Sequence, residues 1–139
     1  MTTIVDAAQA ALAAEHAAVY GYGVVGGQVA GSRRAEAQQA YDAHRARRDV
    51  MARTVADLGA VPVAAAAGYD LPFAVTGPAG AVRLAGYLED RVAGAYGDLV
   101  AAAIGGIRQD AAAAMREAAV RAVRWTGGGV AFPGVAEER

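Results

Sequence analysis

A glutamate in the middle of an apolar helical stripe near the N-terminus constrains the fold more than any other feature of the sequence. The stripe advances in steps of three and four residues, which keeps side chains on one face of a helix. Its members are Ile4, Ala8, Ala11, Glu15, Ala18, Tyr22, Val25 and Val29. Because an unpaired buried charge is costly, Glu15 must be paired, protonated or bound to a ligand. The stripe therefore predicts a long helix over about residues 3–30 that carries one buried polar site.

Three further helices are predicted over about residues 32–58, 78–104 and 107–125. The stripe of the third helix again advances by three and four residues and again has a glutamate, Glu89, at its centre. The second helix has a less regular stripe that includes His44. Two central glutamates on different helices, with a histidine on a third, indicate one polar layer inside the core.

The lengths of the connections predict how these helices are joined. Gly31-Ser32 and Gly105-Gly106 mark short breaks, whereas residues 59–78 contain three prolines and several turn dipeptides, which exclude a continuous helix. Four helices joined by a short, a long and a short link predict an all-α bundle with up-down-down-up topology and one crossover between the second and third helices. We expect residues 1–139 to form one domain, with residues 130–135 as an extended tail.

The composition excludes several classes of protein. The chain of 139 residues has no cysteine, which rules out disulfides and zinc–thiolate sites, and its formal net charge of −1 gives no electrostatic case for binding nucleic acid or a membrane surface. No apolar window is long enough to predict a membrane span, and the N-terminus lacks the cationic start of an export signal. We expect a cytoplasmic location.

Two local sequence patterns have simple structural interpretations. The run from Gly21 to Gly26 matches G-x-G-x-x-G, but it lies inside a helical stripe with no strand before it, so it does not predict a dinucleotide site. Its glycines instead indicate a close helix approach or a kink. The arginines at 45, 47, 48 and 53 alternate with aspartates at helical spacing, which favours an ion-paired, solvated face over a phosphate or nucleic-acid site.

The chain resembles the ferritin-like superfamily in its connection lengths. The runs from Ala14 to Tyr20 and from His44 to Asp49 resemble an uncharacterised ferritin-like domain family of GC-rich bacteria. Di-iron members of the superfamily use a Glu on each of two helices and a Glu-x-x-His pair on each of the other two. Carried over to this sequence, the resemblance implies Glu15, His44, Glu89 and Glu117 as candidate metal ligands.

The sequence departs from that ligand pattern at two positions. Tyr41 stands where the second helix should have a carboxylate, because Asp42 is one residue out of register, and Val120 stands where the fourth helix should have a histidine. These departures argue against a complete di-iron site. They leave either one poorer site for a single transition metal, iron or manganese, or a polar layer without metal in which Tyr22, Arg47 or Arg48 supplies hydrogen bonds and charge.

Three functions stay open from the sequence. The favoured one is a ferritin-like bundle with a degenerate metal site, binding one metal or none and without catalysis. The second is a ferritin-like metal-dependent oxidoreductase, which requires Glu15, His44, Glu89 and a fourth carboxylate to converge. The third is a helical interaction or ligand-binding module that uses the apolar crossover, residues 61–75, as its surface, with a homodimer as one candidate assembly.

Overall fold

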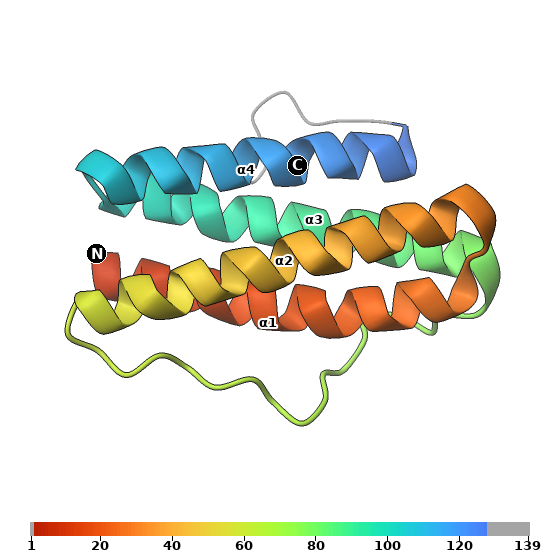
Figure 1. Cartoon of the computed structure of the whole chain (residues 1–139), viewed down its shortest axis with the longest axis horizontal. Helices are drawn as coiled ribbons and strands as arrows, with labels where there is room; N and C mark the ends of the chain where they lie inside the picture. The colour runs from red at the N-terminus through yellow and green to blue at the C-terminus, as the bar shows by residue number, and fades with distance from the viewer. Residues whose placement is uncertain (1, 128–139) are drawn as a thin grey trace.

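Four long helices form the described part of the protein. The computed structural model describes residues 2–127, and the predicted tail at 130–135 lies outside them. The helices are α1 (Ile4–Gln28), α2 (Gly31–Asp57), α3 (Gly77–Ala102) and α4 (Gly105–Thr126), and residues 2–127 contain no strand (Figure 1). The all-α prediction is confirmed, and the predicted ends lie within two residues of the observed ends.

The breaks between helices fall slightly before the glycines that predicted them. Val29 and Ala30 separate α1 from α2, and Ala103 and Ile104 separate α3 from α4, all four with extended backbone. Gly31 and Gly105 then begin the following helices with φ near +60°, a conformation in which a side chain would be strained. The glycines predicted to mark the breaks therefore form the first residues of α2 and α4. At the N-terminus, the Thr3 hydroxyl accepts the Asp6 amide at 3.1 Å, so Thr3 is the N-cap of α1.

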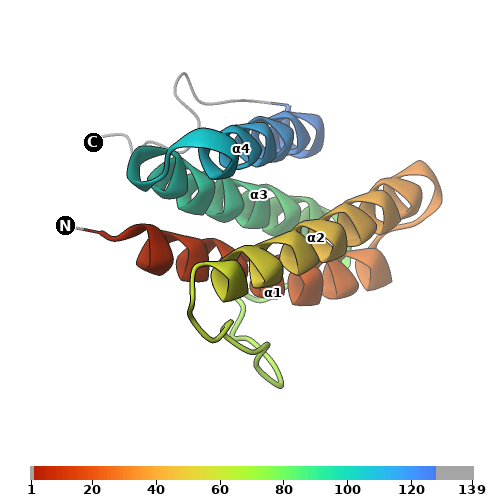
Figure 2. The same ribbon diagram turned by 60° about the vertical axis from the view of Figure 1, so that its left-hand side comes forward.

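The helices pack in the order α2, α1, α3, α4. Contacts are extensive between α2 and α1, between α1 and α3, and between α3 and α4, whereas α2 and α4 barely touch. Both views show α4 lying against α3 and α2 lying against α1 (Figures 1 and 2). We call the meeting of α2 and α4 the α2–α4 seam; the residues that line its small void are Arg47, Val50, Met51, Thr54, Tyr96, Ile107, Asp110 and Ala111.

The apolar core consists of two clusters. One is rich in alanine and includes Leu12, Val55 and Leu99; the other includes Val25, Leu84 and Trp125. Within residues 2–127, the acidic and basic side chains that are fully buried are Glu15, His44 and Glu89. Along α2 and α3, His44 and Glu89 stand between the positions that supply the two clusters, and along α1 Glu15 stands near the end of the first cluster, just before Ala18. The core therefore has a polar layer where the two apolar clusters meet.

The crossover, residues 58–76, is an extended segment without a helix that runs outside the bundle (Figure 1). Its first part is tied to α1: Gln9 donates to the Val61 carbonyl at 2.7 Å and accepts the Val63 amide at 2.9 Å, and His16 Nε2 donates to the Val63 carbonyl at 2.9 Å. Its last part packs Leu71, Phe73 and Val75 against one apolar cluster.

Gly21 of α1 packs closely against Leu88 of α3. A Cβ at this position would stand 2.4 Å from a Leu88 methyl carbon, and Leu88 is itself buried. The close approach predicted for the glycines of α1 is therefore confirmed at Gly21. At Gly23, by contrast, a Cβ would meet no atom within 4 Å.

We expect Gly21→Ala to destabilise the protein by about 1 kcal/mol, because the clash with Leu88 outweighs the better helix propensity of alanine. Gly23→Ala is the matched control and should stabilise by up to about 1 kcal/mol, since it gains propensity without a clash. Urea unfolding of both variants measures the difference. Equal stabilisation by the two substitutions would contradict the close packing of α1 on α3.

Candidate functional site

The polar layer is a buried triad in which one histidine joins two glutamates. His44 Nδ1 lies 2.6 Å from Glu15 Oε2, and His44 Nε2 lies 2.9 and 3.0 Å from the two oxygens of Glu89. Glu15 comes from α1, His44 from α2 and Glu89 from α3, and each side chain is fully buried. We call these residues the Glu15–His44–Glu89 triad.

The environment of His44 favours its charged form. Burial opposes the charge, but hydrogen bonds to Glu15 and Glu89, together with their negative charges, outweigh burial and raise the pKa of His44 to about 9. At neutral pH the ring is therefore an imidazolium, and both ring nitrogens are donors. Each nitrogen donates to a different carboxylate, so the ring has no free lone pair.

Tyr22 and Arg121 complete the surroundings of Glu89. The Tyr22 hydroxyl donates to Glu89 Oε2 at 2.7 Å, and its ring stacks on the His44 ring with centroids 5.4 Å apart. Burial, then the charge of Glu89, raises the pKa of Tyr22 far above its usual range, so the phenol stays neutral. Arg121 of α4 places a guanidinium nitrogen 3.7 Å from Glu89 Oε1. The two carboxylates, Glu15 and Glu89, are therefore matched by two cationic side chains, His44 and Arg121.

The side of the triad at Glu15 is less completely paired. Glu15 Oε1 and the Tyr96 hydroxyl are both buried, and neither has a hydrogen-bond partner. Burial, then the charge of Glu15 and an attraction between its carboxylate and the phenol that is weaker than an ordinary hydrogen bond, raises the pKa of Tyr96 far above its usual range, so the phenol stays neutral.

The structure separates the fourth predicted ligand from the other three. Glu117 is about half exposed and forms a bidentate ion pair with Arg47 that links α4 to α2. Arg47 Nη2 donates to Glu117 Oε1 at 2.8 Å, and Arg47 Nε donates to Glu117 Oε2 at 3.1 Å. This bond also raises the pKa of Arg47, which stays charged. The four groups that the oxidoreductase hypothesis requires therefore do not converge: Glu15, His44 and Glu89 meet, and Glu117 does not.

The positions that depart from the ferritin-like ligand pattern offer no replacement. Tyr41 is partly exposed, with the Arg45 guanidinium over its ring, Asp42 is exposed and accepts from Gln38, and the side chain of Val120 is half exposed. A six-ligand pair of metals does not fit these residues. Across residues 2–127, no group of three or more His, Cys, Asp or Glu side chains is arranged to hold a metal ion.

Sequence reasoning found some of these neighbours and missed others. Tyr22, Arg47 and Arg48 were the expected donors to the triad; only Tyr22 donates to it, because Arg47 pairs with Glu117 and Arg48 with Asp49. Arg121 was missed, although it lies one helical turn after Glu117 on α4. His16, which follows Glu15 in sequence, is half-buried outside the triad and donates to the Val63 carbonyl of the crossover.

Comparisons with known proteins identify relatives without an assigned activity. A family described as "Domain of unknown function (DUF4439)" matches residues 7–137. A crystal structure of a conserved hypothetical protein, rv2844, from Mycobacterium tuberculosis is 37% identical in sequence, with a TM-score of 0.85. The match covers 89% of this chain and 96% of that one. No curated protein matches the chain. No helix within residues 2–127 is long and apolar enough to cross a membrane.

The raised pKa of His44 predicts how stability depends on pH. A group whose pKa is higher in the folded than in the unfolded state stabilises the fold. This contribution is complete at pH values below the pKa of the unfolded chain, which for histidine is near 6.5. That contribution falls as pH rises towards the folded value of about 9. We expect the free energy of unfolding to decrease by on the order of 3 kcal/mol between pH 6.5 and 9, at up to about 1.4 kcal/mol per pH unit.

Urea unfolding at several pH values between 6 and 9.5 measures this loss. His44→Gln is the control, because it keeps a hydrogen-bonding side chain that does not titrate, and its stability should vary much less over that range. A wild-type stability that stays flat between pH 6.5 and 9 would contradict a charged His44 in the folded protein.

Proposed function

Since the chain belongs to the DUF4439 family, we propose its function from the contacts of its buried triad. We propose that it is a non-catalytic, ferritin-like helical bundle in which a proton on His44 takes the place that a metal has in the di-iron members of that superfamily. The charged histidine joins Glu15 and Glu89 and so fixes how three helices pair. The domain then acts as a scaffold that presents its outer surfaces.

The course of the chain supports the ferritin-like part of this proposal. The colour in Figure 1 advances from left to right along α1 and α4, and from right to left along α2 and α3. These directions support the up-down-down-up order that we propose, and the crossover between Asp57 and Gly77 is long enough for α2 and α3 to run in the same direction. The short links on either side make α1 antiparallel to α2 and α3 antiparallel to α4.

One observation carries the proposal about the site: both ring nitrogens of His44 face carboxylate oxygens at 2.6 to 3.0 Å. A histidine that binds a metal presents a lone pair on one nitrogen and uses only the other as a donor. To bind a metal, the triad would have to lose the proton of His44 and break one of its hydrogen bonds. Arg121 beside Glu89 would also repel a cation.

Metal analysis tests the proposal. Protein purified without a His-tag, and its Glu15→Ala variant, should each contain far less than one equivalent of iron or manganese, also after incubation with either ion and desalting. Near-stoichiometric metal in the wild type that disappears in Glu15→Ala would overturn the proposal and restore a single-metal site at Glu15, His44 and Glu89.

A second candidate function uses the crossover as a surface for a second copy of the chain. Val61 is 86% exposed, Val63 is 40% exposed, and the alanines at 64–67 are exposed as well. An apolar segment held in one extended conformation by Gln9 and His16 loses little entropy when it binds. The half-buried Leu71, Phe73 and Val75 are less suited to this role, because they pack on the bundle.

If this segment forms a homodimer interface, Val61→Asp should shift the protein to the monomer, because it places a charge in an apolar contact. Light scattering after size-exclusion chromatography at tens of micromolar protein measures the mass. Val123→Asp is the control, since Val123 is also an exposed valine, at 44% exposure, and lies on α4 away from the crossover. A monomeric wild type, or the same shift in both variants, would contradict the homodimer.

A further inference from the structure

The helix pairs α1–α2 and α3–α4 form an internal repeat. The shift of 74 residues that takes Glu15 to Glu89 also takes Gly31, the first residue of α2, to Gly105, the first residue of α4. Both glycines have φ of +60°. The positions that are identical at this shift are Ala7 and Ala81, Ala11 and Ala85, Glu15 and Glu89, Tyr22 and Tyr96, Gly23 and Gly97, Gly31 and Gly105, Arg34 and Arg108, Ala37 and Ala111, Ala40 and Ala114, and Arg47 and Arg121.

The burial of the side chains follows the same shift. Four buried residues of α2 correspond to four buried residues of α4: Ala37 to Ala111, Ala40 to Ala114, His44 to Ala118 and Met51 to Trp125. On α1 and α3, the paired glutamates and the paired tyrosines are buried as well. Since α1 and α3 pack extensively on each other, the two helix pairs face one another with equivalent residues. A contact from one pair to the other therefore predicts an equivalent contact in the opposite direction.

Glu89 and Glu15 are equivalent carboxylates, but their pairing is unequal. Glu89 accepts the Tyr22 hydroxyl at 2.7 Å. The repeat places Tyr96 against Glu15 in the same way, and besides burial the charge of Glu15 raises the pKa of Tyr96. The Tyr96 hydroxyl and Glu15 Oε1 are nevertheless buried without a hydrogen bond. Because buried polar atoms are almost always paired in native proteins, the side of the triad at Glu15 lacks a donor that the side at Glu89 has.

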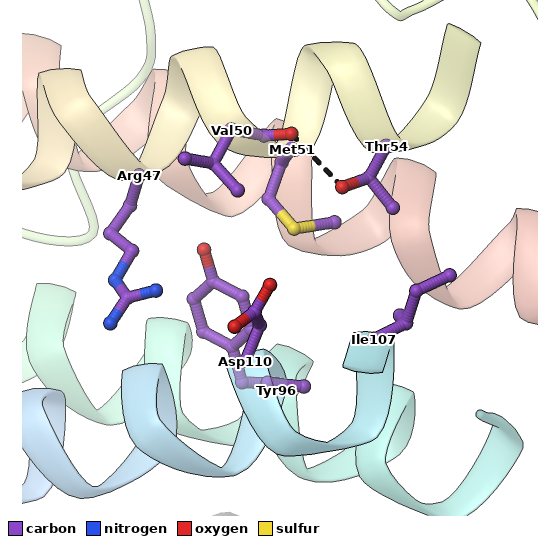
Figure 3. Close-up of a pocket in the computed structure, with 8 residues that line it drawn as sticks. Arg47, Val50, Met51, Thr54, Tyr96, Ile107 and Asp110 are labelled. Carbon is purple, nitrogen blue, oxygen red and sulfur yellow. Dashed lines mark hydrogen bonds between the residues drawn. The ribbon is translucent and has the colours of Figure 1, made fainter. Parts of the chain in front are cut away.

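Arg47 is the arginine that the repeat assigns to Glu15. Its equivalent, Arg121, lies 3.7 Å from Glu89 Oε1, and the two arginine side chains have similar exposures of 24% and 20%. Arg47 instead pairs with Glu117. Arg47 and Tyr96 both line the small void at the α2–α4 seam, and Figure 3 shows the Tyr96 hydroxyl pointing towards α2, the helix that carries Arg47. The guanidinium therefore has space on the side of the phenol.

One difference between the helix pairs explains why the two arginines have different partners. Glu117 stands four residues before Arg121 on α4, and the equivalent residue before Arg47 on α2 is Ala43. At this position α4 therefore offers Arg47 a surface carboxylate, whereas α2 has an alanine. Arg121 accordingly approaches Glu89 in the core, and Arg47 pairs at the surface.

We propose that Arg47 is a switch residue with two alternative carboxylate partners, Glu117 at the surface and Glu15 in the core. The pair with Glu117 joins α2 to α4 and leaves Glu15 Oε1 without a donor. When a basic group of a partner protein pairs with Glu117, Arg47 turns inward and donates to Glu15. The surface of α4 is thereby coupled to the buried polar layer. This inference rests on the proposed metal-free triad, because a metal ion at Glu15 would repel the guanidinium.

Glu117→Ala tests the switch, because it gives α4 the alanine that α2 has at the equivalent position. In a crystal structure of this variant, the Arg47 guanidinium should lie within hydrogen-bond distance of Glu15 Oε1. In solution, NMR should show that the Arg47 Nε proton exchanges with water at least tenfold more slowly than in the wild type, because burial protects it. An Arg47 that stays at the surface, or an exchange that does not slow, would overturn the proposal.

Asp49→Ala is the matched control. Asp49 pairs with Arg48, the neighbour of Arg47 on α2, so this variant also removes a carboxylate from an arginine at the surface. It should leave the exchange of the Arg47 Nε proton unchanged. Equal slowing in both variants would contradict a switch that Glu117 controls.

Ala43→Glu is the reverse test, because it gives α2 the carboxylate that α4 has at the equivalent position. Arg121 should leave Glu89 and pair with the new carboxylate at the surface, as Arg47 pairs with Glu117 in the wild type. Its Nε proton should then exchange with water at least tenfold faster. An Arg121 that stays beside Glu89 with unchanged exchange would contradict the equivalence from which the switch is inferred.

Metal analysis of the same samples separates this inference from the proposed function. If the wild type and Glu117→Ala contain no metal and Arg47 still stays at the surface in the variant, the switch is wrong and the metal-free triad stands. Near-stoichiometric iron or manganese bound by Glu15 in the wild type would overturn both.

Discussion

The two hydrogen bonds of the His44 ring are the interaction on which the rest of this bundle depends. They join α1, α2 and α3 at the middle of the core, and each bonded carboxylate is fully buried. Removing two carboxylates from water is costly, and the protonated ring, Tyr22 and Arg121 offset that cost with charge and hydrogen bonds. A one-residue slip of any of these helices would leave a buried charge unpaired. The triad therefore selects one alignment of helices whose alanine-rich faces alone would tolerate several.

Much of this arrangement could be predicted from the sequence because it follows from periodicity. Glu15 and Glu89 occupy positions of otherwise apolar stripes, so the helical repeat alone assigns them to the interior. The four helices and their ends followed from glycine, proline and stripe positions in the same way. His44 was placed near both glutamates only through the order of the helices, and the structure brings the three residues into direct contact.

The features that the sequence did not predict depend on the distances between helices and on the reach of long side chains. Arg121 on α4 contacts Glu89, whereas Arg47 on α2 points away from the triad and pairs with Glu117. Helical periodicity does not predict which partner such a long side chain contacts. The weak contact between α2 and α4 was also unpredicted, because connection lengths and apolar stripes give the order and direction of the helices but not how closely each pair packs. The Arg47–Glu117 ion pair lies where α2 and α4 make little contact, whereas Arg121 joins two helices, α3 and α4, that pack extensively.

The position of α2 at one end of the helix order has a consequence for local unfolding. Its apolar face rests almost entirely on α1, and α4 restrains it through two arginines, Arg47 bound to Glu117 and Arg33 bound to the Arg124 carbonyl, so we infer that α2 separates from the bundle more readily than the central α3. Its strongest anchor in the core is His44, which binds both glutamates. The imidazolium that aligns the helices thus also holds α2 against the core. Loss of its two hydrogen bonds would let α2 rotate away about the link at Val29 and Ala30 while α1, α3 and α4 stay together.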